Sequence, residues 1–265
     1  MKNILFIFVS LLTVTSCTKI IDIDLNNVDP QYVIEGEITN EARAYQVRIT
    51  KTVNFSEKNN FPAVSDAVVT LSDDAGNTET LREILPGLYE TKTIQGAPGR
   101  TYILSVLHDG KTFTSVSKMP DPVPLLKLTT EESIFGSDGP IGNSKKPYFA
   151  IPFFIDPAGL RNYYRFLQKI NGKPDPAFLV HNDNFSDGKP SVEPVISSGM
   201  DMYKGDTLDF QMQCIDSGVY NYFYSAAAST GSSDTTPANP VSNITGGALG
   251  YFSACSVSEM RIVVE

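Results

Sequence analysis

The chain has 265 residues, with 30 acidic and 21 basic side chains and a formal net charge of −9 at pH 7. Recognition of nucleic acid or of anionic lipid surfaces needs clustered Lys and Arg, so this balance argues against both as partners. The length allows either two domains of ordinary size or one large all-β body, and we predict two.

The first residues have the pattern of an export signal. Lys2 precedes an apolar run over residues 4–14, which is much too short to cross a bilayer as a helix. The stretch "VTSC", which ends at Cys17, resembles a bacterial lipobox, in which small residues precede a cysteine whose sulfur carries diacylglycerol. We predict a lipoprotein signal peptide over residues 1–16 and lipidation of Cys17, because two or more acyl chains hold a protein stably at a membrane. The alternative is an ordinary signal peptide whose apolar run happens to precede a cysteine.

Short strands separated by turns are predicted from residue 31 to residue 118, after a lipidated tether over residues 17–30. In residues 45–55 apolar and polar side chains alternate, which places the apolar ones on one face of a strand. Turns are predicted at residues 74–77 and at Asp109-Gly110, a dipeptide suited to the positive φ angles of a tight hairpin. Strands at this spacing predict an N-terminal antiparallel β-sandwich over residues 31–118.

A proline-rich segment, residues 119–126, is the predicted linker between domains, because closely spaced prolines interrupt ladder pairing and stiffen the chain. Residues 127–265 are predicted to form a β-rich domain with one short helix over residues 217–229, capped by Asp216 or Ser217. Pro152 cannot donate a ladder hydrogen bond, so its strand is expected at a sheet edge or with a bulge. The predicted fold class is therefore mainly β.

Two cysteines, Cys214 and Cys255, remain after Cys17, and both lie in predicted strands. An exported protein can oxidise such a pair to a disulfide. The alternative is that both are small buried apolar side chains, because the sequence does not show how far apart they lie.

Motifs that carry chemistry are few. The sequence contains no G-x-S-x-G nucleophile elbow, no H-E-x-x-H, no C-x-x-C and no phosphate-cradling glycine loop, so we predict that the protein is not an enzyme and needs no cofactor. In "HNDNFSDG", Asp183, Asn184 and Asp187 crowd oxygen atoms that could bind Ca²⁺, although their spacing is not that of an EF-hand. Asn, Asp and Gly are also the residues that turns require, so a plain turn is the alternative.

Motifs along the mature chain resemble a known family. The most specific ones lie in "FFIDPAGLRNYYRF" and "PANPVSNITGGALGYFSA", and together with the lipobox and "YVIEGEIT" they resemble the Bacteroidetes lipoproteins of the domain-of-unknown-function family number 4249. The resemblance implies an envelope lipoprotein, of a kind often encoded beside TonB-dependent outer-membrane receptors, with no assigned activity and no catalytic residue to transfer. The first half also resembles the immunoglobulin-like or carboxypeptidase-regulatory-like modules that cap such receptors.

Two triplets resemble the short O-glycosylation sites of Bacteroidetes envelope proteins. They are "DTL", which contains Thr207, and "DTT", which contains Thr235. Triplets this short often arise by chance, and Thr235 in its polar loop is expected to be the more accessible of the two.

We expect a lipid-anchored protein of the outer membrane, on its periplasmic face or at the cell surface, that acts by binding. The expected partner is a TonB-dependent outer-membrane receptor in nutrient uptake, and the small-molecule or glycan ligand is open. Two alternatives belong to other classes. One is a carbohydrate-active enzyme on the same anchor, and the other is a structural envelope lipoprotein.

Overall fold

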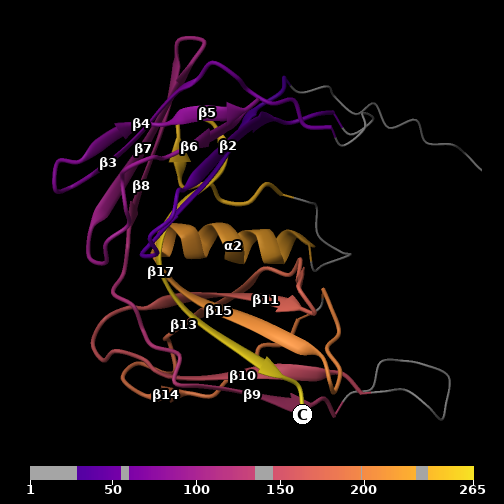
Figure 1. Cartoon of the computed structure of the whole chain (residues 1–265). Coiled ribbons are helices and arrows are strands. Elements are labelled where there is room, and N and C mark those ends of the chain that lie inside the picture. The colour runs from indigo at the N-terminus through magenta and orange to yellow at the C-terminus, as the bar shows by residue number, and fades with distance from the viewer. Residues whose placement is uncertain (1–28, 55–59, 135–145, 198, 231–237) are drawn as a thin grey trace, which may run out of the picture.

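The computed structural model describes residues 29–54, 60–134, 146–197, 199–230 and 238–265 (Figure 1). These residues form three β-sheets and one α-helix, which confirms the prediction of a mainly β protein with a single short helix. Within these ranges no helix has both the length and the apolar character that a membrane crossing requires.

The largest sheet is mixed and runs through both halves of the molecule. Its strand order is β12-β11-β15-β17-β1-β2-β6-β5, and β13 also pairs with β11. The strands of this sheet are β1 (Tyr32–Thr39), β2 (Gln46–Lys51), β5 (Arg82–Leu85), β6 (Leu88–Glu90), β11 (Tyr163–Ile170), β12 (Lys173–Pro174), β13 (Leu179–Asn182), β15 (Thr207–Ile215) and β17 (Leu249–Val263).

Two smaller sheets cover parts of the large one. The first has the order β16-β8-β7-β3-β4 and the second has the order β14-β10-β9. Their strands are β3 (Val68–Asp73), β4 (Thr78–Thr80), β7 (Thr101–His108), β8 (Lys111–Lys118), β9 (Lys127–Glu132), β10 (Tyr148–Ile155), β14 (Pro190–Ser191) and β16 (Ile244–Thr245).

The strand β17 is 15 residues long and belongs to both halves of the molecule. Its first part, Leu249 to Cys255, pairs in parallel with β1. Its second part, Ser256 to Val263, pairs antiparallel with β15. A parallel neighbour has to reach its partner through a long connection, and here the last strand of the chain lies beside the first.

Gly250 permits the close approach of β17 to β1. Its φ angle is +96°, and a Cβ atom at this position would lie 2.0 Å from the carbonyl oxygen of Ile34. Only glycine adopts this conformation without strain and leaves room for the neighbouring backbone.

The core of the N-terminal sandwich contains side chains from the end of the chain. Ile244, Phe252 and Ala254 are buried in the same apolar cluster as Ile34 and Val69. Strand β16 also extends the sandwich's second sheet by pairing with β8. Segments before and after residues 119–126 therefore share one sheet and one core, while the predicted domain boundary there stays a prediction.

The Asn243 side chain holds the start of β17 in place. Its Nδ2 donates to the carbonyl oxygen of Phe252 (2.8 Å), and its Oδ1 accepts from the Phe252 N–H (3.0 Å). The amide thus replaces a strand partner for one residue. This gives a structural role to part of the "NITGGALGYF" motif.

The proline-rich segment, residues 119–126, is packed against the body. Met119, Val123 and Leu125 are all buried. The N–H of Leu125 donates to the Ser258 hydroxyl of β17 (2.9 Å), and the N–H of Val123 points to the Cys214 sulfur (3.4 Å). Val123 and Leu125 belong to the second core, which lies between the three-stranded sheet and the large one.

The helix α2 (Ser217–Thr230) lies across the large sheet, between the N-terminal sandwich and the C-terminal strands (Figure 1). Its buried residues Val219, Phe223 and Ala226 are spaced three or four apart, as expected of one helical face. The Arg165 guanidinium of β11 lies over the Phe223 ring at 3.7 Å from its centroid. The prediction of a helix over residues 217–229 is confirmed to within one residue.

Asp216 joins three segments of the chain. One carboxylate oxygen accepts from the N–H of Val219 (2.9 Å), so Asp216 is the residue that caps α2. The other accepts from the Ser117 hydroxyl and from the N–H of Lys118, at the end of β8. The Ser117 oxygen in turn accepts from the N–H of Ala254 in β17 (2.8 Å).

The predicted turns are present, and of the two alternatives for Pro152 the sheet edge does not hold. Asp109 and Gly110 have φ angles of 49° and 71° and connect β7 to β8, as the hairpin prediction requires. Pro152, however, does not lie on an edge strand, because β10 is the central strand of its sheet. On the side of β10 opposite β9, pairing occurs at Ala150 and at Phe154, so Pro152 lies where that ladder is interrupted.

Replacement of Asp216 by Ala should destabilise the fold. The loss of an N-cap costs about 1 kcal/mol, and the lost hydrogen bonds to a charged acceptor cost about 1.5 to 3 kcal/mol more. We expect urea denaturation to show a fall of about 2.5 to 4 kcal/mol in the free energy of unfolding. Ser217→Ala is the matched control, with an expected change below about 0.5 kcal/mol. A larger effect for Ser217→Ala than for Asp216→Ala would contradict the assignment of the cap.

Candidate functional site

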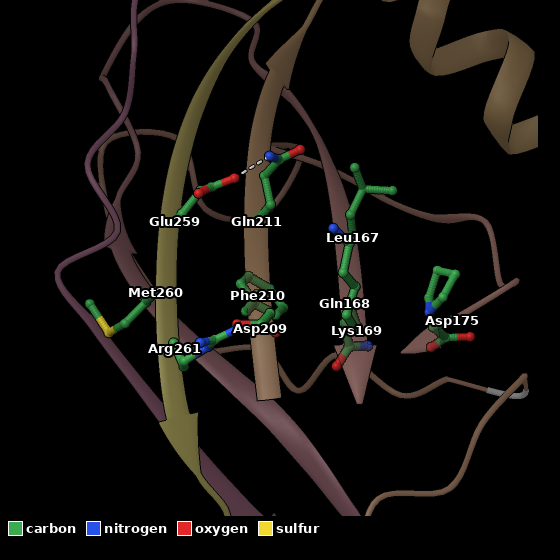
Figure 2. Close-up of a pocket in the computed structure, with 11 residues that line it drawn as sticks. Leu167, Gln168, Lys169, Asp175, Asp209, Phe210, Gln211, Glu259, Met260 and Arg261 are labelled. Atoms are coloured by element: carbon green, nitrogen blue, oxygen red, sulfur yellow. Dashed lines mark hydrogen bonds and ion pairs between the residues drawn. The ribbon is translucent and has the colours of Figure 1, made fainter. Parts of the chain in front are cut away.

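A groove of about 740 Å³ lies on one face of strands β11, β15 and β17 (Figure 2). We call it the sheet groove. Its floor consists of two rows of side chains, each crossing three neighbouring strands. The first row is Leu167, Gln211 and Glu259, and the second is Lys169, Asp209 and Arg261.

The sheet groove is the uncovered half of the face on which α2 packs. Side chains alternate between the two faces of a strand, so Arg165, Leu167 and Lys169 project on the same side of β11. Arg165 contacts the helix residue Phe223, whereas Leu167 and Lys169 line the groove. The helix therefore covers one end of this face and leaves the other end open.

Polar side chains in the sheet groove are paired with one another. The Arg261 guanidinium makes two contacts with the Asp209 carboxylate, from Nε to Oδ1 and from Nη2 to Oδ2, the latter at 2.9 Å. The hydrogen bond from Arg261 lowers the pKa of Asp209, so this carboxylate stays ionised. Within the first row, Gln211 donates from Nε2 to the Glu259 carboxylate.

Asp175 lies at the rim of the sheet groove (Figure 2). Its Oδ1 accepts from the N–H of Ala177 (3.0 Å), but its buried Oδ2 has no hydrogen-bond partner among the described residues. Such an atom is costly unless another donor satisfies it.

The groove offers both donors and acceptors with nearly balanced charge. Lys169 and Arg261 are cationic, Asp209 and Glu259 are anionic, and Gln211 can donate and accept. This arrangement suits a neutral polar ligand that also donates and accepts, such as a sugar or a peptide backbone.

The structure brings two of the three predicted calcium ligands together. Oxygen atoms of Asp183 and Asp187 lie within 4.8 Å of each other and of Asp156, a residue that we did not predict. Asn184, the third predicted ligand, is exposed. Asp156 lies in the loop between β10 and β11, far from Asp183 in the sequence. Its place in the "FFIDPAGLRNYYRF" motif marks it in the sequence, but a motif alone does not show which distant residues lie beside it.

Cys214 and Cys255 are free thiols and are both buried. Cys214 lies opposite Ser256 on β17, and Cys255 is the next residue along that strand, so the two side chains project from opposite faces of the sheet. Cys214 packs in the core beneath the three-stranded sheet, and Cys255 packs under α2. The structure thus does not join them in a disulfide, and both are buried as small apolar side chains.

The predicted glycosylation and lipidation sites lie outside the groove and the carboxylate cluster or outside the described residues. Thr207 is the first residue of β15 and is partly buried, and its N–H donates to the Asn171 side chain (2.9 Å). Cys17 and Thr235 lie outside the described residues.

One family model matches the chain. It is described as "Domain of unknown function (DUF4249)" and covers residues 18–261. A search of curated proteins gave no match.

The two buried thiols should react slowly in the native state. Burial raises the pKa of both Cys214 and Cys255, which disfavours the reactive thiolate. In a Cys17→Ala variant at pH 8, we expect slow labelling by a disulfide-exchange reagent and rapid labelling of two thiols after denaturation in guanidinium. A denatured protein with no free thiol before reduction would instead show that the cysteines form a disulfide.

Proposed function

The chain belongs to the DUF4249 family, a domain of unknown function, and we propose that it is a lipid-anchored envelope protein that acts by binding. In this proposal Cys17 carries the lipid in the outer membrane. The folded body binds a polar ligand and assists a TonB-dependent outer-membrane receptor in nutrient uptake.

The sequence before the fold supports the anchor. The stretch "VTSC" ends at Cys17, and the first strand, β1, begins at Tyr32. The chain between them is long enough to act as a tether from the membrane to the body. Figure 1 shows β1 entering the N-terminal sandwich, with the C-terminus at the opposite end of the molecule. A lipid on Cys17 would therefore attach the body through its N-terminal sandwich.

The open sheet groove is the observation that carries the proposal of binding. It is a preformed hollow on a rigid sheet, and its charged side chains are oriented by cross-strand partners. A ligand could exchange hydrogen bonds with the exposed end of Arg261, whose side chain is 72% exposed.

The charge pairing in the groove limits the role that Asp209 could take in glycoside hydrolysis. A glycosidase needs one carboxyl group that stays protonated to act as an acid and a second that stays ionised. Arg261 lowers the pKa of Asp209, which suits Asp209 to the ionised role and not to the role of acid. The pairing therefore supports a positioning role for these charges.

The anchor and the partner can be tested together in native envelopes. We expect palmitate labelling of the wild-type protein, because a lipidated Cys17 carries acyl chains. Cys17→Ala should abolish the labelling, and retained labelling would refute the anchor. Cys214→Ala is the matched control, because this buried thiol should not affect lipidation.

The second arm is crosslinking of the tagged wild-type protein, followed by mass spectrometry. We expect a TonB-dependent receptor in near-stoichiometric amount. We also expect less of it with Cys17→Ala, which removes the high local concentration that the membrane supplies. Recovery of the wild-type protein alone would contradict the role as a receptor accessory.

A further inference from the structure

Two loops meet beside the start of β11 and hold three carboxylates together. The first loop connects β10 to β11 and contains Asp156, and the second connects β13 to β14 and contains Asp183 and Asp187. The N–H of Asn162 donates to Asp183 Oδ2 (2.8 Å), and the N–H of Gly159 donates to Asp187 Oδ1 (2.7 Å). The two acidic residues of the second loop are thereby fixed against the first loop.

This cluster lacks a positive charge among the described residues. Asp156 is 1% exposed and Asp183 is 5% exposed. None of the ion pairs in the described part of the chain includes Asp156, Asp183 or Asp187. Asp187 is exposed, and the Asp156 carboxylate accepts hydrogen bonds from the Tyr164 hydroxyl and from the N–H of Gly188. These neutral donors leave the negative charges in place, so a bound cation would relieve the repulsion between the carboxylates.

A buried hydroxyl without a partner lies on the same side of the second loop. The N–H groups of Ser186 and Asp187 both donate to the carbonyl oxygen of Asp183 (3.0 and 3.1 Å), which makes residues 183–187 one helical turn. Positions i, i+3 and i+4 of such a turn face the same side, so Ser186 faces the same way as the two carboxylates. Ser186 is 7% exposed, and its Oγ has no hydrogen-bond partner among the described residues.

The other two residues of the turn face solvent. Asn184 is exposed, and Phe185 is 89% exposed. The turn therefore has a polar inner side, formed by Asp183, Ser186 and Asp187, and an outer side that does not contribute to the cluster.

We propose that Asp156, Asp183 and Asp187 bind one Ca²⁺ ion, with the Ser186 hydroxyl as a further ligand directly or through a water molecule. The ligand set consists entirely of oxygen atoms, which selects a hard cation over zinc or copper. Oxygen ligands on opposite sides of one Ca²⁺ lie about 4.6 to 5.2 Å apart, so carboxylate oxygens within 4.8 Å of one another can share the ion. Mg²⁺ has shorter bonds, spans only about 4.0 to 4.2 Å and demands a regular octahedron.

The site would connect the two loops through the metal. Its Ca²⁺ would neutralise the buried charge and satisfy the Ser186 hydroxyl at the same time. This inference does not depend on the receptor or on the sheet groove, so its failure and theirs are separate outcomes.

The test is a calcium titration of the purified full-length protein after removal of metals with a chelator. Calorimetry should give one site per chain, with a Kd of about 10⁻⁴ to 10⁻³ M, as in extracellular calcium modules. At a calcium concentration about a hundred times the Kd, Tm should rise by about 5 to 10 °C. The same concentration of Mg²⁺ should give a much smaller rise.

Variants within the one turn distinguish ligands from bystanders. Asp187→Asn is the primary variant because Asp187 is exposed and its replacement should leave the fold intact, as a circular dichroism spectrum in chelator would verify. We expect its Kd for Ca²⁺ to rise about tenfold or more. Ser186→Ala should weaken calcium binding without loss of stability in chelator, because the hydroxyl it removes has no partner there. Asn184→Ala is the matched control and should bind Ca²⁺ like the wild-type protein.

Two results would overturn the proposal. One is a wild-type protein whose Tm does not change in 10 mM CaCl₂ and which shows no calorimetric binding. The other is calcium binding that is unchanged in Asp187→Asn but weakened in Asn184→Ala, because the ion would then lie on the outer side of the turn.

Discussion

The shared strand β17 is the constraint on which the rest of the structure depends. Its first part completes the sheet of the N-terminal sandwich beside β1, and its second part pairs with β15 against the C-terminal core. Gly250 permits the close parallel approach, and the Asn243 amide holds the backbone of Phe252. Because one strand serves both halves, β17 has to pair with β1 before the N-terminal half is complete.

The position of α2 and of the sheet groove follows from this strand. Ser117 of β8 contacts both Ala254 of β17 and the capping residue Asp216, so the start of the helix is fixed relative to the shared strand. The helix then covers one end of the face formed by β11, β15 and β17 and leaves the groove at the other end. Each of the two loops with the clustered carboxylates connects the large sheet to the three-stranded sheet in the same half of the molecule.

Features that depend on near neighbours in the chain could be predicted from the sequence. The hairpin at Asp109-Gly110, the helix that begins at Ser217 and its cap at Asp216 each follow from a few adjacent residues. Pairing of β17 with β1 could not be predicted, because an apolar strand does not specify which distant strand it joins. For the same reason the meeting of Asp156 with Asp183 was missed, although the acidic turn itself was identified. The projection of the Cys214 and Cys255 side chains from opposite faces of the sheet also depends on the register of β15 and β17, which the sequence does not show.

The central claim is that the N-terminal sandwich requires the end of the chain, and a fragment comparison tests it most directly. Residues 30–126 alone lack β16 and β17, whereas a second fragment would add residues 241–256 through a flexible glycine-serine linker. Urea denaturation of both fragments, followed by circular dichroism, should show a cooperative transition only for the fragment that contains the added strand. A cooperative transition and a native β-sheet spectrum from residues 30–126 alone would contradict the account.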